Sequence, residues 1–205
     1  MKRGIISIMI CALSFWTLPV QASLVTIQIT AEVDSVYDAG NYLEGKIKPG
    51  DLITGFYTYE FTTPDSNPST IVGHYWHYSP PAGISLTVGG LNFKTDPANV
   101  NFLVGVGNND PSDIYWLVSY NNLALSNGTS VDTIGWQLED PTGTVFSSDE
   151  LPTTAPVLED WQSNVLHIYG VKDAFHIFSE VTSAVPEPTA ILLFGLGALL
   201  LRKRL

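Results

Sequence analysis

The sequence predicts an all-β domain, an antiparallel β-sandwich or jelly roll, between two terminal segments of different composition. Apolar and polar residues alternate in many short stretches, which is typical of strands that bury one face. Gly, Pro, Asn and Asp recur between these stretches and mark turns. Between residues 23 and 184, no window of a dozen residues shows helical periodicity without Gly or Pro. Eight or more such strands bury a common core best in two packed layers.

The first strand is expected at residues 24–33, where the alternation is regular. Val25 and Ile27 fall on one face, and Thr26 and Gln28 fall on the other. Because successive side chains of a strand point to opposite faces, this pattern predicts a half-buried strand.

The later strands follow from the same period and from the turns between them. A second strand is expected at 53–61, and a hairpin at 84–94 turns at Gly89 and Gly90, since both tolerate positive φ. Further strands are expected at 100–106, 114–120, 133–138, 165–169 and 174–181. The turns between them are expected at 108–111, 127–128 and 140–143.

The charge distribution limits the partners of the central segment. The chain has 9 Lys+Arg and 20 Asp+Glu, for a net charge of −11. Residues 23–184 contain four lysines, no arginine and nineteen acidic residues, so this segment carries −15. Nucleic acid is excluded as a partner because phosphate recognition needs a basic face. The only cysteine, Cys11, precedes this segment, which excludes disulfides and thiol chemistry from it.

Residues 1–22 are interpreted as a signal peptide, handled by the secretion machinery and signal peptidase. A cationic start, an apolar run and a small-residue cleavage site follow one another. These features are Lys2-Arg3, residues 5–16 and Val20-Gln21-Ala22. Ser23 would then be the first residue of the mature chain. The alternative, a permanent N-terminal anchor, needs a longer apolar span.

Residues 185–205 have the features of a transient membrane anchor. A proline-rich break precedes an apolar run, and a cationic stop ends the chain. These parts are Pro186-Glu187-Pro188, residues 190–201 and Arg202-Lys203-Arg204. The cations stay on the cytoplasmic side, so the domain faces outward. A helix of twelve residues spans about 18 Å, less than the roughly 30 Å apolar core of a bilayer. An ordinary tail anchor is the alternative.

This tail closely resembles the PEP-CTERM sorting signal. The resemblance lies in the Pro186-Glu187-Pro188 motif, the apolar helix and the basic end, and it covers 185–205 only. It implies that exosortase, a membrane protease, processes the chain after export across the inner membrane of a Gram-negative bacterium. It also implies a surface or matrix location near exopolysaccharide, in a biofilm for example. It implies no activity for the domain at 23–184.

The segment His74-Tyr75-Trp76-His77 is a candidate glycan-binding site. In a strand, His74 and Trp76 share one face, and an exposed aromatic plane suits the apolar face of a sugar ring. The alternative is that Trp76 and Tyr78 pack in the core or at a sheet edge, because Trp is usually largely buried.

Metal sites are weakly indicated. His74, His167 and His176 would form a zinc site only if three separate strands met. Calcium suits Asp110 and Asp113 better, with Glu139-Asp140 near Asp149-Glu150 as a second oxygen cluster. More often, such residues cap turns. We therefore expect no cofactor, with structural calcium left open.

The leading interpretation is a non-enzymatic, exported structural or adhesive matrix protein. No Gly-x-Ser-x-Gly elbow or phosphate-binding loop occurs, and nineteen acids make some carboxylate pair inevitable. The alternatives are a lectin-like carbohydrate-binding module, which predicts an exposed aromatic pair, and a glycan-active enzyme, which predicts facing carboxylates in a cleft.

Overall fold

A computed structural model describes residues 24–109 and 111–187. The predicted signal peptide at 1–22 and the predicted apolar helix at 190–201 lie outside these residues. Within them, no helix is long and apolar enough to cross a membrane.

Ten strands and two short 3₁₀ turns make up the described chain, so the all-β prediction is confirmed. The strands are β1 (Leu24–Tyr37), β2 (Leu52–Glu60), β3 (Val72–His77), β4 (Gly83–Val88), β5 (Leu91–Lys94), β6 (Phe102–Gly107), β7 (Asp113–Ser119), β8 (Val131–Asp140), β9 (Ser163–Gly170) and β10 (His176–Pro186). The 3₁₀ turns span Leu158–Asp160 and Val171–Asp173. The expected strands all occur, and β3 joins them at the segment treated above only as a candidate site.

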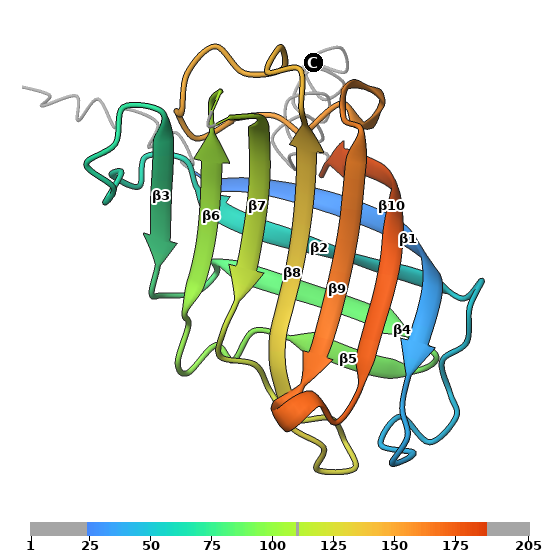
Figure 1. Cartoon of the computed structure of the whole chain (residues 1–205). Coiled ribbons are helices and arrows are strands. Elements are labelled where there is room, and N and C mark those ends of the chain that lie inside the picture. The colour runs from blue at the N-terminus through green and yellow to red at the C-terminus, as the bar shows by residue number, and fades with distance from the viewer. Residues whose placement is uncertain (1–23, 110, 188–205) are drawn as a thin grey trace, which may run out of the picture.

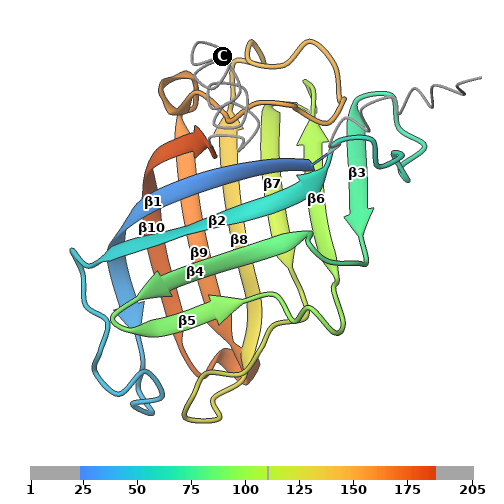
Figure 2. The ribbon, with the colours of Figure 1, turned by 180° about the vertical axis from the view of Figure 1, so that it is seen from behind.

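All ten strands belong to one antiparallel sheet, in the order β3-β6-β7-β8-β9-β10-β1-β2-β4-β5. In Figure 1, β1, β2, β4 and β5 cross behind β6–β9 at a steep angle, and in Figure 2, seen from the opposite side, they cross in front. The two layers of the sandwich are therefore two halves of one curled sheet.

The long strands β1 and β10 carry the sheet from one layer to the other. Their pairing shifts register between Thr30 and Ala31 and again between Val33 and Ser35. Such irregularities bend a strand and increase its twist. Each strand can therefore belong to both layers.

Large aromatic side chains fill the space between the layers. The indole of Trp136 lies edge-on to the rings of Tyr57 and Tyr115, with ring centroids 5.9 and 6.1 Å away. The Tyr115 hydroxyl donates to the Tyr57 hydroxyl at 3.3 Å, and the Tyr59 hydroxyl donates to the carbonyl of Pro152 at 2.7 Å. Burial raises the pKa of all three phenols. The core thus hides polar atoms that keep hydrogen-bond partners.

Candidate functional site

Exposed aromatic rings gather around Trp76, near the end of β3. We call Trp76, Tyr78 and Tyr120 the Trp76 cluster. The Trp76 and Tyr78 rings are parallel within 4°, with centroids 6.1 Å apart, and Tyr120 lies 5.8 Å from Trp76 at 30°. Tyr78 is 69% exposed and Tyr120 is 41% exposed, while Trp76 is half-buried. An exposed aromatic surface therefore exists at the predicted segment.

A groove of about 390 Å³ adjoins this cluster. Trp76 and Tyr78 line it together with the polar residues Glu60, Thr62 and Thr63. The groove thus combines aromatic planes with carboxylate and hydroxyl groups. Sites that bind polar ligands with apolar faces need both kinds of contact.

His74 shares the outer face with Trp76, as predicted, but packs elsewhere. Its ring lies edge-on to Trp116 at a centroid distance of 5.7 Å. The Trp116 indole in turn covers the backbone of Gly105, where a Cβ would clash with it. His74 therefore belongs to a ring contact that covers a glycine of the sheet, a known way to protect such a position.

His77, on the opposite face of β3, is a buried structural residue. Its Nδ1–H donates to the carbonyl of Tyr75 at 3.0 Å, and its Nε2 accepts from the backbone N–H of Glu60 at 3.1 Å. Burial lowers its pKa, so the ring stays neutral at pH 7. His77 fastens the edge strand β3 to the end of β2.

The three other histidines do not meet. His167 stacks on Tyr169 with centroids 4.9 Å apart, and His176 packs edge-on to the same ring at 4.8 Å. His74 lies on β3, four places from β9 in the strand order. Among residues 24–109 and 111–187, no group of three metal-ligating side chains comes together.

The carboxylate of Asp113 fastens two loops. Asp113 is fully buried at the start of β7. Its Oδ1 accepts from the N–H of Asn109 at 2.9 Å, and its Oδ2 accepts from the N–H groups of Val145 and Phe146 at 2.8 and 2.7 Å. This geometry favours turn capping, the alternative to calcium. Asp110, the other predicted ligand, lies outside the described residues.

Asp140 makes the same kind of contact on the next strand. It pairs with Asp113 across β7 and β8. Its carboxylate accepts from the backbone N–H and hydroxyl groups of Thr142 and Thr144 at 2.7 to 3.3 Å. These bonds lower its pKa to about 2. Pattern analysis located this acidic turn but not the bonds that hold it.

A second groove, of about 760 Å³, opens where β9 and β10 separate. It is lined by residues 154–159, 161, 162 and 164 and by residues 180–184 and 186. Asn164 bridges the strands, because its Nδ2 donates to the carbonyl of Val181 at 2.7 Å. The Nε1 of Trp161, which lines this groove, is buried and has no hydrogen-bond partner among residues 24–109 and 111–187. No sequence signal distinguished this groove.

The predicted sorting motif begins on the sheet itself. β10 ends at Pro186, which pairs with Ile27 of β1, and the N–H of Glu187 donates to the carbonyl of Thr26 at 3.0 Å. Because the N–H groups of neighbouring residues in a strand point to opposite sides, the nitrogen of Pro186 faces away from β1. The proline therefore costs no hydrogen bond between β10 and β1. The predicted domain boundary at 184/185 therefore falls inside β10. Pro188 and the cations at 202–204 lie outside the described residues.

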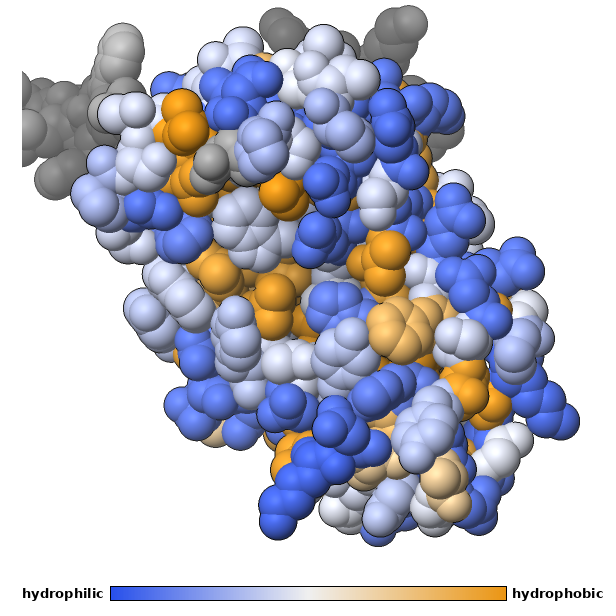
Figure 3. Space-filling model, viewed as in Figure 1, coloured by the Kyte–Doolittle hydropathy of each residue, from blue (hydrophilic) through white to orange (hydrophobic). Residues whose placement is uncertain are grey.

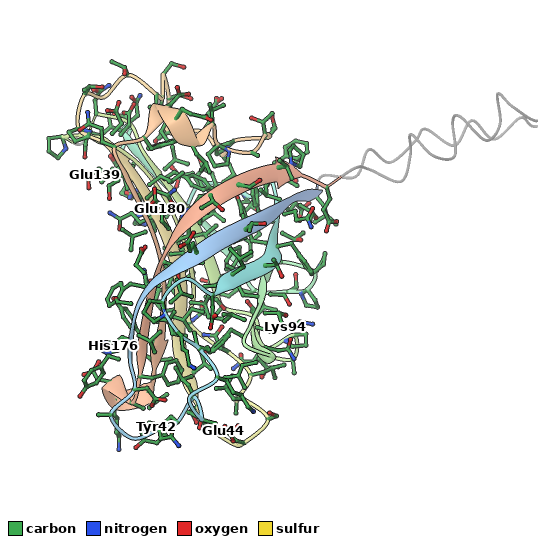
Figure 4. All side chains as sticks on the ribbon, turned by 90° about the vertical axis from the view of Figure 1, so that its right-hand side faces the viewer. Tyr42, Glu44, Lys94, Glu139, His176 and Glu180 are labelled. Atoms are coloured by element: carbon green, nitrogen blue, oxygen red, sulfur yellow. The ribbon has the colours of Figure 1, made fainter. Side chains whose placement is uncertain are left out.

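Figures 3 and 4 show how hydrophobic and polar side chains are distributed on the molecule. In Figure 3, hydrophobic residues over β6–β10 form separate patches among hydrophilic ones. In Figure 4, Glu139 and Glu180 lie toward one end of the molecule, while Tyr42 and Glu44 lie at the other. In the view of Figure 3, the hydrophobic surface is therefore divided into several small patches.

Comparison with known proteins identifies the tail alone. Residues 184–204 match the family described as the PEP-CTERM protein-sorting motif. No curated protein and no solved structure matches the chain.

Proposed function

Because the chain carries a PEP-CTERM protein-sorting motif, which marks an exported target of exosortase, we propose that it is a structural or adhesive protein of the extracellular matrix. In this proposal, signal peptidase cuts after Ala22 and the C-terminal helix is a transient anchor. Exosortase then processes the chain at Pro186-Glu187-Pro188, and the domain reaches the surface or exopolysaccharide matrix of a Gram-negative bacterium.

The observation that carries the adhesive role is the exposed Trp76 cluster. Tyr78, directly after the edge strand β3, and Tyr120, directly after β7, both expose their rings to solvent. An exposed aromatic surface binds partners through apolar contact. Because exposed rings contribute little to the core, we expect their removal to leave the fold intact. We propose no catalytic role, since the buried His77, Asp113 and Asp140 are held in structural hydrogen bonds.

Binding of the mature protein to exopolysaccharide from the producing strain tests this proposal. We expect the double substitution Trp76→Ala and Tyr78→Ala to weaken co-sedimentation about tenfold, equivalent to about 1.4 kcal/mol. Tyr37→Ala is the control, because it removes a 56% exposed ring from β1, far along the sheet. Equal binding by wild type and the double variant would reject the adhesive role of the cluster.

A carbohydrate-binding module is the second candidate, favoured by the groove beside the rings. Glu60, Thr62 and Thr63 offer hydrogen-bonding groups next to the aromatic planes. A specific module predicts saturable binding to one class of oligosaccharide on a glycan array. Competition by that oligosaccharide would favour this candidate, and binding that only long polymers compete would favour general adhesion.

A further inference from the structure

The strand that holds the sorting motif is the first strand of the mature chain. β1 begins at Leu24, and its residues Thr26 to Gln28 face the last residues of β10. β1 is itself fixed from the other side, where Ile27 pairs with Tyr57 of β2. Ile27 is fully buried. The receiving strand is therefore part of the folded core.

The end of β10 is held much less firmly. The backbone pairing of β9 with β10 ends at Ser179, and the Asn164 side chain adds a bond to Val181. Beyond Val181, the groove of about 760 Å³ lies beside β10. Val185, Pro186 and Glu187 are exposed. Among the described residues, 184–187 therefore pair with β1 alone, and terminal segments of this kind open at low cost.

A protease that reads an extended segment competes with this pairing. Extended peptides are commonly bound by strand addition, in which main-chain groups of the peptide bond to the partner. Here the N–H of Glu187 already donates to Thr26. The same group cannot serve both partners at once.

We propose that residues 24–28 of β1 are an internal docking strand for the sorting motif, and that exosortase processes the chain only after residues 184–187 leave β1. The folded domain thereby competes with its own protease for the motif. This inference depends on the sorting motif and is independent of any matrix or glycan role.

A reversible cross-link between the two strands tests the proposal. Gln28 and Val185 are paired across β1 and β10, and Val185 precedes the Pro-Glu-Pro residues. The double variant Gln28→Cys, Val185→Cys therefore locks the strands without altering the motif. All precursors carry Cys11→Ala, because the natural Cys11 in the predicted signal peptide would otherwise be a competing thiol. The full-length precursor is incubated in exosortase-containing membranes, oxidised or reduced, and cleavage is followed by gel.

We expect the oxidised variant to be processed at least tenfold more slowly than wild type, with the wild-type rate restored by dithiothreitol. The matched control is Thr54→Cys, Thr87→Cys, which joins exposed paired residues of β2 and β4 away from the motif. This control should be processed at the wild-type rate in both states.

Three results would overturn the proposal. Rapid processing of the oxidised lock would show that exosortase reads the docked strand. Equal slowing of the Thr54–Thr87 lock would show a general effect of cross-linking. Slow processing of the reduced variant would assign the effect to the substitutions themselves.

Discussion

At the scale of single residues, two buried aspartates hold the loops at one end of the sheet. Asp113 accepts three backbone N–H groups from two loops, and Asp140 accepts from its own turn. Hydrogen bonds to a charged acceptor are stronger than neutral ones. The sequence showed acidic, turn-rich segments here, but calcium sites and turn caps use the same residue types. The loop at 144–146 is distant in sequence, so its bond to Asp113 follows only from the fold.

Removal of the Asp113 carboxylate should destabilise the domain strongly. Asp113→Ala leaves three backbone donors without their acceptor, and we expect the free energy of unfolding to fall by about 3 kcal/mol or more. Urea denaturation measures this loss. Asp132→Ala, at an exposed position of β8, should change stability by less than about 0.5 kcal/mol. Similar small losses for both variants would contradict the fastening role.

Acid should unfold the domain partly through Asp140. Its pKa is lowered to about 2, chiefly by the N–H of Thr144 and the hydroxyl of Thr142. In the unfolded chain an Asp titrates near 3.9. The contribution of Asp140 is therefore complete above about pH 4 and is lost as the pH falls toward 2. Urea titrations at pH 5 and pH 2.5 should show a smaller pH effect for Asp140→Asn than for wild type.

At the scale of elements, close contact between rings and glycines shapes the outer face. Trp116 of β7 lies over Gly105 of β6, and His167 of β9 lies over Gly135 of β8. The alternation of apolar and polar residues predicted these strands, because a strand with one buried face has an apolar side chain at every second position. Apart from the hairpin at 84–94, which pairs β4 with β5, it left open which strands pair, since the other pairings depend on distant segments. The bend of β1 and β10 was unpredictable for the same reason.

Gly105→Ala should disturb the β6–β7 contact. The added methyl group would overlap the Trp116 indole, so the ring must move, and such overpacking costs about 1 to 3 kcal/mol. Gly107→Ala is a control in the same strand, because its nearest neighbour would be Ile114 Cβ at 3.7 Å, an ordinary contact. Thermal unfolding and tryptophan fluorescence should change for Gly105→Ala alone. Equal effects at both glycines would argue against the ring contact.

At the scale of the whole molecule, the aromatic interior makes stability depend on alkaline pH. Burial raises the pKa of Tyr57 and Tyr115 well above that of a free phenol. The unfolded chain releases these protons near pH 10, whereas the folded chain retains them. The contribution of these two phenols to the free energy of unfolding is therefore fully present below pH 10 and is lost as the pH rises beyond it.

Absorbance of tyrosinate, followed together with circular dichroism, measures this effect. We expect the ionisation of Tyr57 and Tyr115 to coincide with loss of β signal above pH 10. The variant Tyr57→Phe should show a weaker alkaline loss, since it has one fewer proton to release. Full ionisation of all nine tyrosines in a folded protein would contradict the buried positions.

The pairing of Thr26 with Glu187 also makes the domain a portable unit. Its first and last strands, β1 and β10, are neighbours, so the chain enters and leaves the domain at adjacent points. Domains with adjacent ends tolerate insertion into a loop of another protein. Residues 24–187 could therefore be inserted into a surface loop of an unrelated host protein, with both junctions side by side.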